Sequence, residues 1–313
     1  MPKVSVIIPV YGVEKYIERC ARSMFMQTLN DLEFIFVDDC TKDNSMSILN
    51  AIINDYPHRK TQIKIIHHDK NLGLPYARKT GVTVAEGDFI IHCDSDDWVD
   101  TRMFELMYNS AVENKSDIAF SDFYRSNGAN SLREKGLLSF NKESIIRDIL
   151  IRNIPGCVWN KMVRRDLYFE NPLIYPVNNM GEDTALMMQL ISRGSSFSYV
   201  EEPLYYYYVS PSSMTNSTSL DAIYKHFYQS LENAELVFNA INPFIRSRQI
   251  QQSIVKFKYD IKYQITKVFT LDKKSYKLWR TTYPEISSQL FFNRYLTVFN
   301  KAQYYLTYIK SMI

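Results

Sequence analysis

Two spacing patterns alternate along the first 125 residues, and this alternation is the feature that most limits how the chain can fold. Apolar, β-branched runs typical of buried strands occupy residues 4–10, 33–37, 62–66, 88–93 and 117–120. Segments with apolar residues at helical spacing lie between them, at 13–27, 45–53, 74–84 and 101–114. Strands and helices that alternate in this way form a mostly parallel sheet covered by helices. The sequence therefore predicts an α/β fold whose ligands bind beyond the carboxyl ends of the strands.

The pattern changes after residue 125. A polar, irregular stretch at 126–140 predicts a mobile loop, 141–152 and 184–192 predict helices, 197–209 predicts an aromatic strand, and only helices are expected beyond 220. We therefore expect a catalytic domain at 1–218 and a basic, aromatic-rich helical region at 219–313. The net charge is +8 over residues 221–313 and −5 over the first 220. This asymmetry predicts different partners for the two parts.

The composition is that of a globular protein with a large core, because 46% of the 313 residues are hydrophobic and 23% are charged. The four cysteines are scattered without a CxxC pair, which predicts buried free thiols in a reducing compartment. The first residues do not resemble a signal peptide, and no stretch reaches the ~18 apolar residues of a membrane span. We expect a cytoplasmic protein that can lie on the inner face of the plasma membrane.

Acidic and polar residues gather where the predicted strands end. Residues 88–98 read DFIIHCDSDDW, so an apolar strand ends in three aspartates within four positions. Tyr11-Gly12 and Asp38-Asp39 end two other strands. Because the carboxyl ends of parallel strands share one edge of a sheet, these residues are expected to line one cleft.

The aspartate cluster predicts a metal site. Carboxylates this close repel one another and resist desolvation, so they face either open water or a cation. Oxygen ligands spaced as D-x-D suit Mg²⁺ or Mn²⁺, and such an ion would hold a diphosphate. The chain has no GxGxxG and no GxxxxGK[ST], which argues against the usual dinucleotide and P-loop sites. A solvated turn at 94–97 and simple helix capping by Asp38 and Asp39 are the alternatives.

Five motifs together resemble family 2 glycosyltransferases of the GT-A fold, inverting enzymes of the bacterial surface-polysaccharide type. They are VSVIIPVY at 4–11, FVDDCTKD at 36–43, NLGLPYARKTG at 71–81, AEGDFIIHCDSDDW at 85–98 and GEDTAL at 181–186. Their order and spacing fit the family over about 210 residues, two thirds of the chain. Each motif alone is weak, and their order gives the resemblance its specificity.

The resemblance implies a donor site for a UDP-sugar. It assigns nucleotide contacts to Pro9, Val10, Tyr11, Glu14, Asp39, Arg78, Asp94 and Ser95. A tyrosine face at Tyr11 suits base stacking, and the Asp39 carboxylate suits the N3–H donor of uracil. Arg78 is expected to hold Asp39 or a phosphate. Plain surface exposure of Arg78 is the alternative.

The resemblance also implies a metal and a catalytic base. Asp96 would hold Mn²⁺ or Mg²⁺, with Asp97 as the next contributor. Asp183 would be the general base, and Glu182 would raise the pKa of Asp183 or orient the acceptor. Both acids precede a predicted helix, so a favourable charge at its N-terminus is the alternative.

Trp159 and Lys161 resemble a segment on the acceptor side of the family, and a buried Trp anchor is equally compatible with the sequence. One departure concerns the donor diphosphate. Relatives carry an Arg after the tyrosine strand, and this chain has Tyr208-Val209 there, while Ser213 is kept. The departure puts the family's basic contact to the diphosphate in doubt, and Lys161 or Arg164 are candidate substitutes.

The basic region suggests a membrane surface. Lysines surround apolar residues at helical spacing in 254–279, which fits an amphipathic helix on anionic lipid or an ordinary helix packed on the domain. No nucleic-acid-binding motif is present, so we expect no nucleic-acid partner.

The sequence as a whole predicts a metal-dependent inverting glycosyltransferase that moves a sugar from a UDP-sugar to a glycan or lipid-linked glycan. A nucleotidyltransferase with a similar sheet is one alternative, and a basic glycine-rich loop after the first strand would favour it. The other alternative is a catalytically inactive nucleotide-sugar-binding scaffold, which the intact acids argue against.

Overall fold

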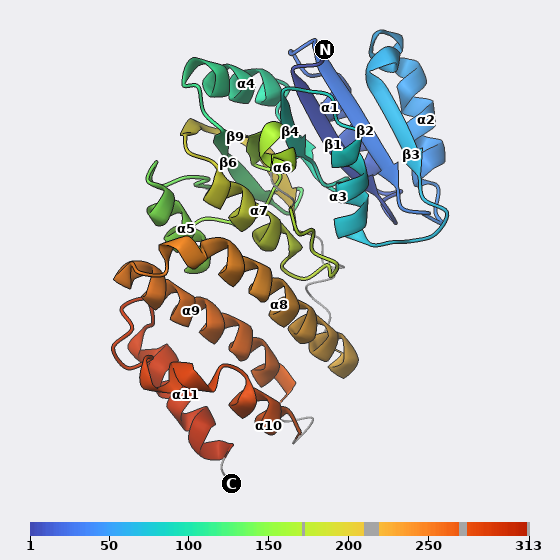
Figure 1. Ribbon diagram of the computed structural model, residues 1–313. Helices are drawn as coiled ribbons and strands as arrows, with labels where there is room; N and C mark the ends of the chain where they lie inside the picture. Colours follow the sequence, from blue (N-terminus) through green and yellow to red (C-terminus); the bar gives the residue numbers. More distant parts are fainter. Residues whose placement is uncertain (171–172, 210–218, 269–273, 312–313) are drawn as a thin grey trace.

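The computed structural model describes residues 1–170, 173–209, 219–268 and 274–311 (Figure 1). The strands are β1 (Val4–Val10), β2 (Leu32–Asp38), β3 (Ile63–His67), β4 (Phe89–His92), β5 (Trp98–Val99), β6 (Ile118–Ser126), β7 (Ser131–Glu134), β8 (Lys161–Arg164) and β9 (Phe197–Tyr208). The helices of residues 1–209, the part expected to be the catalytic domain, are α1 (Ile17–Phe25), α2 (Ser45–Asp55), α3 (Leu74–Thr83), α4 (Met103–Glu113), α5 (Lys142–Leu150), α6 (Asp166–Phe169) and α7 (Glu182–Arg193).

One mixed sheet organises the catalytic domain, with the strand order β3-β2-β1-β4-β8-β6-β9-β5 and β7 paired to β6. The first four strands are parallel, as the alternating pattern predicts. β1 and β2 are completely buried because helices cover both of their faces, which explains their continuous apolar runs. The prediction of an α/β fold with a mostly parallel sheet is confirmed.

Two strands differ from the sequence-based expectation. β8 lies antiparallel between β4 and β6, so the fifth predicted strand does not pair with the fourth. β7 lies inside the stretch predicted to be a loop, where it forms a hairpin with β6. The Asn127 side chain accepts hydrogen bonds from the backbone N–H groups of Ala129 and Asn130, and Gly128 adopts a φ of 89°. This Asn-Gly turn chemistry closes the hairpin and is visible in the sequence.

The described residues after 219 contain helices only, which confirms that expectation. They are α8 (Leu220–Ile241), α9 (Arg248–Gln264), α10 (Lys274–Thr281) and α11 (Val298–Lys310), with short 3₁₀ turns between them. α7 packs on α8 and α5 packs on α9, so the orange helices in Figure 1 lie directly against the catalytic domain. Among the described residues, no helix combines the length and apolarity that crossing a membrane requires.

Candidate functional site

The carboxyl ends of β1, β2 and β4 meet at one edge, here called the rim. Val10 pairs with Asp38 in the ladder of β1 and β2, and Ile7 pairs with His92 in that of β1 and β4. The residues that follow these strands, including Asp39 and Asp94, therefore lie at the same edge, on either side of the end of β1. The predicted clustering of the three strand ends is confirmed.

The turn after β1 is tied to the turn after β2. Gly12 donates its backbone N–H to Thr41 Oγ1 at 2.9 Å, and Glu14 donates its own to Asp43 at 2.9 Å. A carboxylate oxygen of Glu14 accepts from the Asn44 N–H at 3.1 Å. Tyr11 is 53% exposed above this junction, whereas the preceding Pro9 and Val10 are buried in β1. Tyr11 is thus the member of the predicted nucleobase trio with an open side-chain face.

Asp39 is buried, and both oxygens of its carboxylate accept hydrogen bonds. One oxygen accepts from the backbone N–H of Leu72 and the other from that of Gly73, each at 2.8 Å. The His68 ring nitrogen Nδ1 lies 2.8 Å from the same carboxylate. Gly73 has a φ of 91°, so these bonds fix the left-handed turn that begins α3. Asp39 therefore shapes the loop beside the rim, in addition to the uracil contact that the resemblance implies.

Arg78 of α3 is the centre of the site. Its side chain is 1% exposed, and its Nε donates to Glu182 Oε1 at 2.9 Å. Nη2 donates to Asp94 Oδ1 at 2.8 Å and lies 3.2 Å from Asp183 Oδ1. The expectation that Arg78 holds Asp39 is corrected, since His68 and two backbone N–H groups occupy that carboxylate. One buried guanidinium instead joins the DSDD and GED motifs.

The centre holds three carboxyl groups and one guanidinium. Burial raises the pKa of Glu182 well above its usual value, the Arg78 charge opposes this, and Asp183 adds to it. Burial likewise raises the pKa of Asp94, against the same guanidinium. Nη1 of Arg78 and Oε2 of Glu182 are buried without a hydrogen-bond partner among the described residues. Three carboxylates therefore share one guanidinium, and either a proton or a further cation would relieve their repulsion.

The remaining acids of DSDD have separate environments. Asp97 is fully buried, and its two oxygens accept from the Tyr205 hydroxyl and the Tyr208 N–H, each at 2.6 Å. Asp96 stays partly open, and burial together with the nearby Asp94 raises its pKa to about 6. Ser95 between them is 5% exposed. Asp97 thus anchors β9 in this structure, and Asp96 is the more exposed of the two acids.

The residues at the rim fit a divalent cation of the Mg²⁺ class. Within the described ranges, no three His, Cys, Asp or Glu side chains form a complete metal cage. Mg²⁺ sites that use a nucleotide need only one or two carboxylates, because phosphates and water supply the other ligands. Asp96 meets this requirement, and the nearby carboxylate of Asp94, which helps to raise the pKa of Asp96, would favour a cation between them.

Arg19 of α1 is a neighbour of the rim that the sequence reasoning missed. Its guanidinium lies 3.6 Å from the centre of the Trp98 ring, and Nη2 donates to the Asp96 carbonyl at 2.8 Å. These contacts fix the backbone at Asp96. The two residues are 77 positions apart, so local spacing gave no signal for the pair.

Trp159 and Lys161 lie in the interior, so the structure places neither as an open acceptor contact. The Trp159 ring stacks on Tyr205 with centres 4.3 Å apart. Lys161 is 0% exposed, and its Nζ donates to the carbonyls of Pro155 and Cys157 at 3.0 and 2.8 Å. The reason is packing: Trp159 lies against the aromatic rings of β9, and Lys161 fixes the 155–157 loop. Burial lowers the pKa of Lys161, and nearby Cys157 and Asp183 oppose this.

The helical region holds the loop that precedes Glu182 and Asp183. Asn233 of α8 is buried, and its side-chain amide donates to the carbonyls of Asn178 and Met180 at 2.8 and 2.9 Å. Gly181, the last residue before α7, has a φ of 80°, which favours glycine. The position of the predicted base therefore depends on α8.

The basic stretch 254–279 is largely committed to internal contacts where it is described. Lys256 pairs with Asp260 at 2.6 Å, and Lys258 pairs with Glu285 at 2.6 Å. Lys262 is buried and donates to the Thr282 carbonyl at 2.8 Å. The structure thus favours a helix packed on the domain over a free basic stripe. Lys267, Lys273 and Val268 lie outside the residues whose side chains are described, as does Ser213.

Comparison with known proteins agrees with this geometry. The family model described as glycosyl transferase family 2 matches residues 5–170. "Uncharacterized glycosyltransferase EpsJ" of Bacillus subtilis (strain 168) is 30% identical over 76% of this chain and 70% of its own length. "Cholesterol galactosyltransferase" of Borreliella burgdorferi is 31% identical over 70% of this chain and 63% of its own length. "Poly(ribitol-phosphate) beta-glucosyltransferase" of Bacillus spizizenii is 30% identical over 66% of this chain but only 32% of its own length.

Solved structures show the same fold. Residues 1–349 of S. aureus TarS in complex with UDP-GlcNAc superpose with a TM-score of 0.61 at 18% identity, over 88% of this chain and 83% of that one. This likeness confirms the GT-A architecture. With the family match and the first relative, it shows that this chain belongs to glycosyl transferase family 2 and is a glycosyltransferase.

Proposed function

We propose that this chain transfers a sugar from a UDP-sugar, with inversion, to a glycan or lipid-linked glycan during cell-surface polysaccharide synthesis. The observation that carries the proposal is the Arg78 centre. It brings Asp94, on the donor side, within 2.8 Å and Asp183, the candidate base, within 3.2 Å of the same guanidinium nitrogen. Donor and acceptor chemistry would thus meet around one fixed charge.

The donor would bind along the rim. The exposed Tyr11 ring offers a stacking face for the nucleobase, with Pro9 and Val10 behind it and Glu14 at the border. The Asp39 carboxylate would accept from uracil N3–H, and Asp94 with Ser95 would face the ribose. The UDP-GlcNAc complex of TarS supports a UDP-sugar as the first donor to test.

Asp183 would act as the general base, with Glu182 held beside it by Arg78. A single displacement at the anomeric carbon inverts its configuration and requires a base on the acceptor side to take the hydroxyl proton. Mn²⁺ or Mg²⁺, held by Asp96, would neutralise charge on the departing diphosphate. Asp97 stays a predicted second contributor, although both its oxygens bond β9 here.

Calorimetric titration of UDP tests this proposal. Binding should require Mn²⁺ or Mg²⁺, should be lost in EDTA, and should fall sharply in Asp96→Ala. Asp88→Ala is the matched control, because Asp88 is exposed at the opposite end of β4. An absence of UDP binding in every condition would sink the UDP-sugar proposal. Metal-dependent UDP binding without turnover of any UDP-sugar would favour the inactive scaffold.

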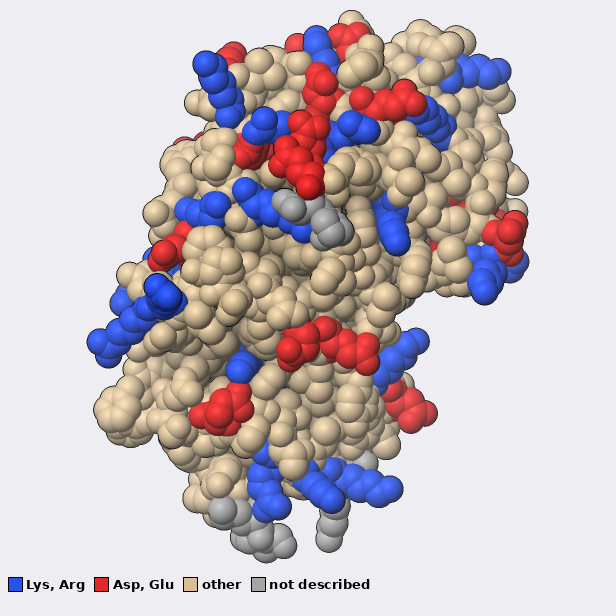
Figure 2. Space-filling view, viewed as in Figure 1, with Lys and Arg blue, Asp and Glu red and all other residues tan. Residues whose placement is uncertain are grey.

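We further propose a cytoplasmic location with peripheral contact to anionic membrane through the end of the helical region. Phe291, Phe292 and Phe299 are exposed there, and residues 286–313 contain Arg294, Lys301 and Lys310 but no acid. On the face drawn in Figure 2, basic side chains gather at the lower end, where α10 and the C terminus lie in Figure 1. A region that combines exposed aromatic rings with basic groups suits an anionic bilayer surface.

Co-sedimentation with vesicles tests this contact. The protein should pellet with phosphatidylglycerol vesicles at low salt and stay in solution with phosphatidylcholine alone. The triple variant Phe291→Ser, Phe292→Ser, Phe299→Ser should lose this binding. The control, Leu132→Ser, changes an exposed apolar residue of the catalytic domain. If the wild type fails to pellet with either vesicle, the membrane proposal is wrong.

A further inference from the structure

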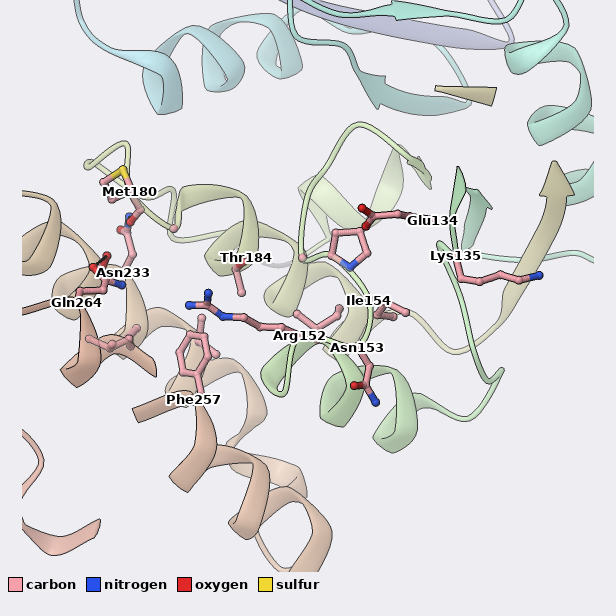
Figure 3. Close-up of a pocket in the computed structure, with 18 of the residues that line it drawn as sticks. Glu134, Lys135, Arg152, Asn153, Ile154, Met180, Thr184, Asn233, Phe257 and Gln264 are labelled. Atoms are coloured by element: carbon pink, nitrogen blue, oxygen red, sulfur yellow. Dashed lines mark hydrogen bonds between the residues drawn. The ribbon is translucent and has the colours of Figure 1, made fainter. Parts of the chain in front are cut away.

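A cleft of about 560 Å³ lies between the catalytic domain and the helical region, apart from the rim (Figure 3). The loop after α5, the start of α7, and helices α8 and α9 contribute its walls. The lining residues used below are Arg152, Asn153, Thr184, Asn233, Phe257 and Gln264. Its size suits a short run of sugar residues rather than a single ion.

The cleft opens beside the candidate base. Gly181 and Thr184, which flank Glu182 and Asp183 in the sequence, both line it. A Cβ on Gly156 would meet Thr184 Oγ1 at 2.5 Å, so the 152–156 loop and the first turn of α7 are in close contact. The buried Lys161 holds the Pro155 carbonyl in that loop at 3.0 Å. A ligand in the cleft would therefore lie next to the turn that carries Asp183.

Arg152 gives the cleft its charge. Figure 3 shows its guanidinium extended toward the middle of the cleft, between Thr184 and Phe257, whereas the Lys135 amino group points away. Arg152 has a φ of 63°, a left-handed backbone that a non-glycine residue rarely adopts.

The acid beside Arg152 does not neutralise it completely. Arg152 Nε lies 3.3 Å from Asp260, and Lys256 occupies the same carboxylate at 2.6 Å. Arg125 and Glu134, the other opposite charges that line the cleft, are paired with each other. One carboxylate between two cations leaves a net positive charge at Arg152.

We propose that this cleft binds the carbohydrate chain of an anionic acceptor, with Arg152 on a phosphate or carboxylate group of that chain. The side-chain amides of Asn153 and Gln264 suit sugar hydroxyls, and Phe257 offers an apolar face to a ring. A guanidinium matches the oxygens of phosphate and carboxylate groups. The inference rests on the proposed transferase function and adds the acceptor class to it.

Binding measurements with defined oligomers test the proposal without an acceptor of known identity. The probes are a ribitol-phosphate oligomer, a uronate-containing tetrasaccharide and a neutral glucose tetrasaccharide, each titrated with and without UDP and Mn²⁺. The variants are Arg152→Asn, which tolerates the left-handed backbone, and Arg152→Lys, which keeps the charge. Arg246→Asn is the control, since Arg246 is exposed elsewhere in the helical region.

At least one anionic oligomer should bind the wild type, and Arg152→Asn should weaken it by about tenfold or more, the scale of a lost charge-assisted bond. Arg152→Lys should retain more affinity than Arg152→Asn, Arg246→Asn should match the wild type, and UDP affinity should be unchanged throughout. Comparison of the two anionic probes identifies phosphate or carboxylate as the preferred group.

Equal binding of the neutral and anionic oligomers, an unchanged Arg152→Asn variant, or binding of UDP but of no oligomer would overturn the inference. If UDP fails to bind while an anionic oligomer still binds through Arg152, the proposed donor is wrong and the cleft assignment stands.

Discussion

The catalytic domain and the helical region each bury a basic side chain, and the groups that surround the two side chains differ. In the catalytic domain, the Arg78 guanidinium lies among Asp94, Glu182 and Asp183. In the helical region, Lys262 Nζ donates to the Thr282 carbonyl and lies 4.3 Å from the centre of the Trp279 ring. Burial raises the pKa of two of the acids around Arg78, and it lowers the pKa of Lys262 to about 8. Burial thus opposes the charged form in both regions, and the difference lies in the partners: three carboxylates surround Arg78, whereas a carbonyl and an aromatic ring lie beside Lys262.

The largest effect should come from Asp183, the acid beside Arg78 that we propose as the general base. Asp183→Asn should lower transfer by roughly 10²–10⁴-fold, because it removes the proposed base and keeps the shape. UDP affinity should stay within about twofold, since the proposed nucleotide contacts do not include Asp183. Single-turnover assays beside UDP calorimetry make the test. Transfer at the wild-type rate would show that these acids only balance Arg78.

Arg78→Met should be the most destabilising single change. It leaves Asp94, Glu182 and Asp183 without their shared cation, and breaking such a buried network costs about 3–5 kcal/mol. Urea unfolding of Arg78→Met beside Lys262→Met measures the contrast directly. Similar losses of unfolding free energy in the two variants would show that the two buried basic side chains contribute equally to stability.

Lys262→Met should change how stability depends on pH. The folded-state pKa of about 8 lies below the ordinary 10.5, so the unfolded chain binds the extra proton between these values and stability rises with pH. Between pH 7 and 9.5 this one group adds on the order of 2 kcal/mol. The rise should be smaller by that amount in Lys262→Met when urea midpoints are compared. An identical pH profile in both proteins would contradict the buried-lysine assignment.

The smallest effect should come from Lys258, a lysine of the same helix that is less buried than Lys262 and has an exposed ion-pair partner. Lys258 pairs with Glu285, whose side chain is 48% exposed. Lys258→Met should therefore cost less than about 1 kcal/mol and leave the pH profile of the wild type intact. A larger loss would mean that paired charges, and not only packing, support the helical region.

The parallel half of the sheet could be predicted from the sequence because its information is local. Each of β1 to β4 is a short apolar run, and the strand ends place Tyr11, Asp39 and Asp94 at one rim by topology alone. The position of β8 could not be predicted, since Lys161–Arg164 is short and its place between β4 and β6 depends on pairing across distant segments.

The contacts between residues of the site could not be predicted from local sequence patterns either. Arg78 meets Glu182 across 104 positions, and no spacing rule distinguishes that partner from Asp39. Lys161 was a candidate contact to the acceptor or the diphosphate, and Lys262 was one of the lysines in the predicted basic helix. Both are buried, next to carbonyl oxygens or aromatic rings. Such burial depends on the assembled core, which periodicity does not describe.

The two hydrogen bonds from Asn233 to the carbonyls of Asn178 and Met180 have a consequence for how this chain can vary. They make α8 part of the support for the turn that carries Asp183. A truncation near residue 218 would therefore remove hydrogen bonds that support the turn before Asp183, in addition to the helical region itself. If the cleft and Asp183 act as proposed, a change in the helical region would alter acceptor binding and the position of Asp183 together, while the turns after β1 and β2 keep their own hydrogen bonds.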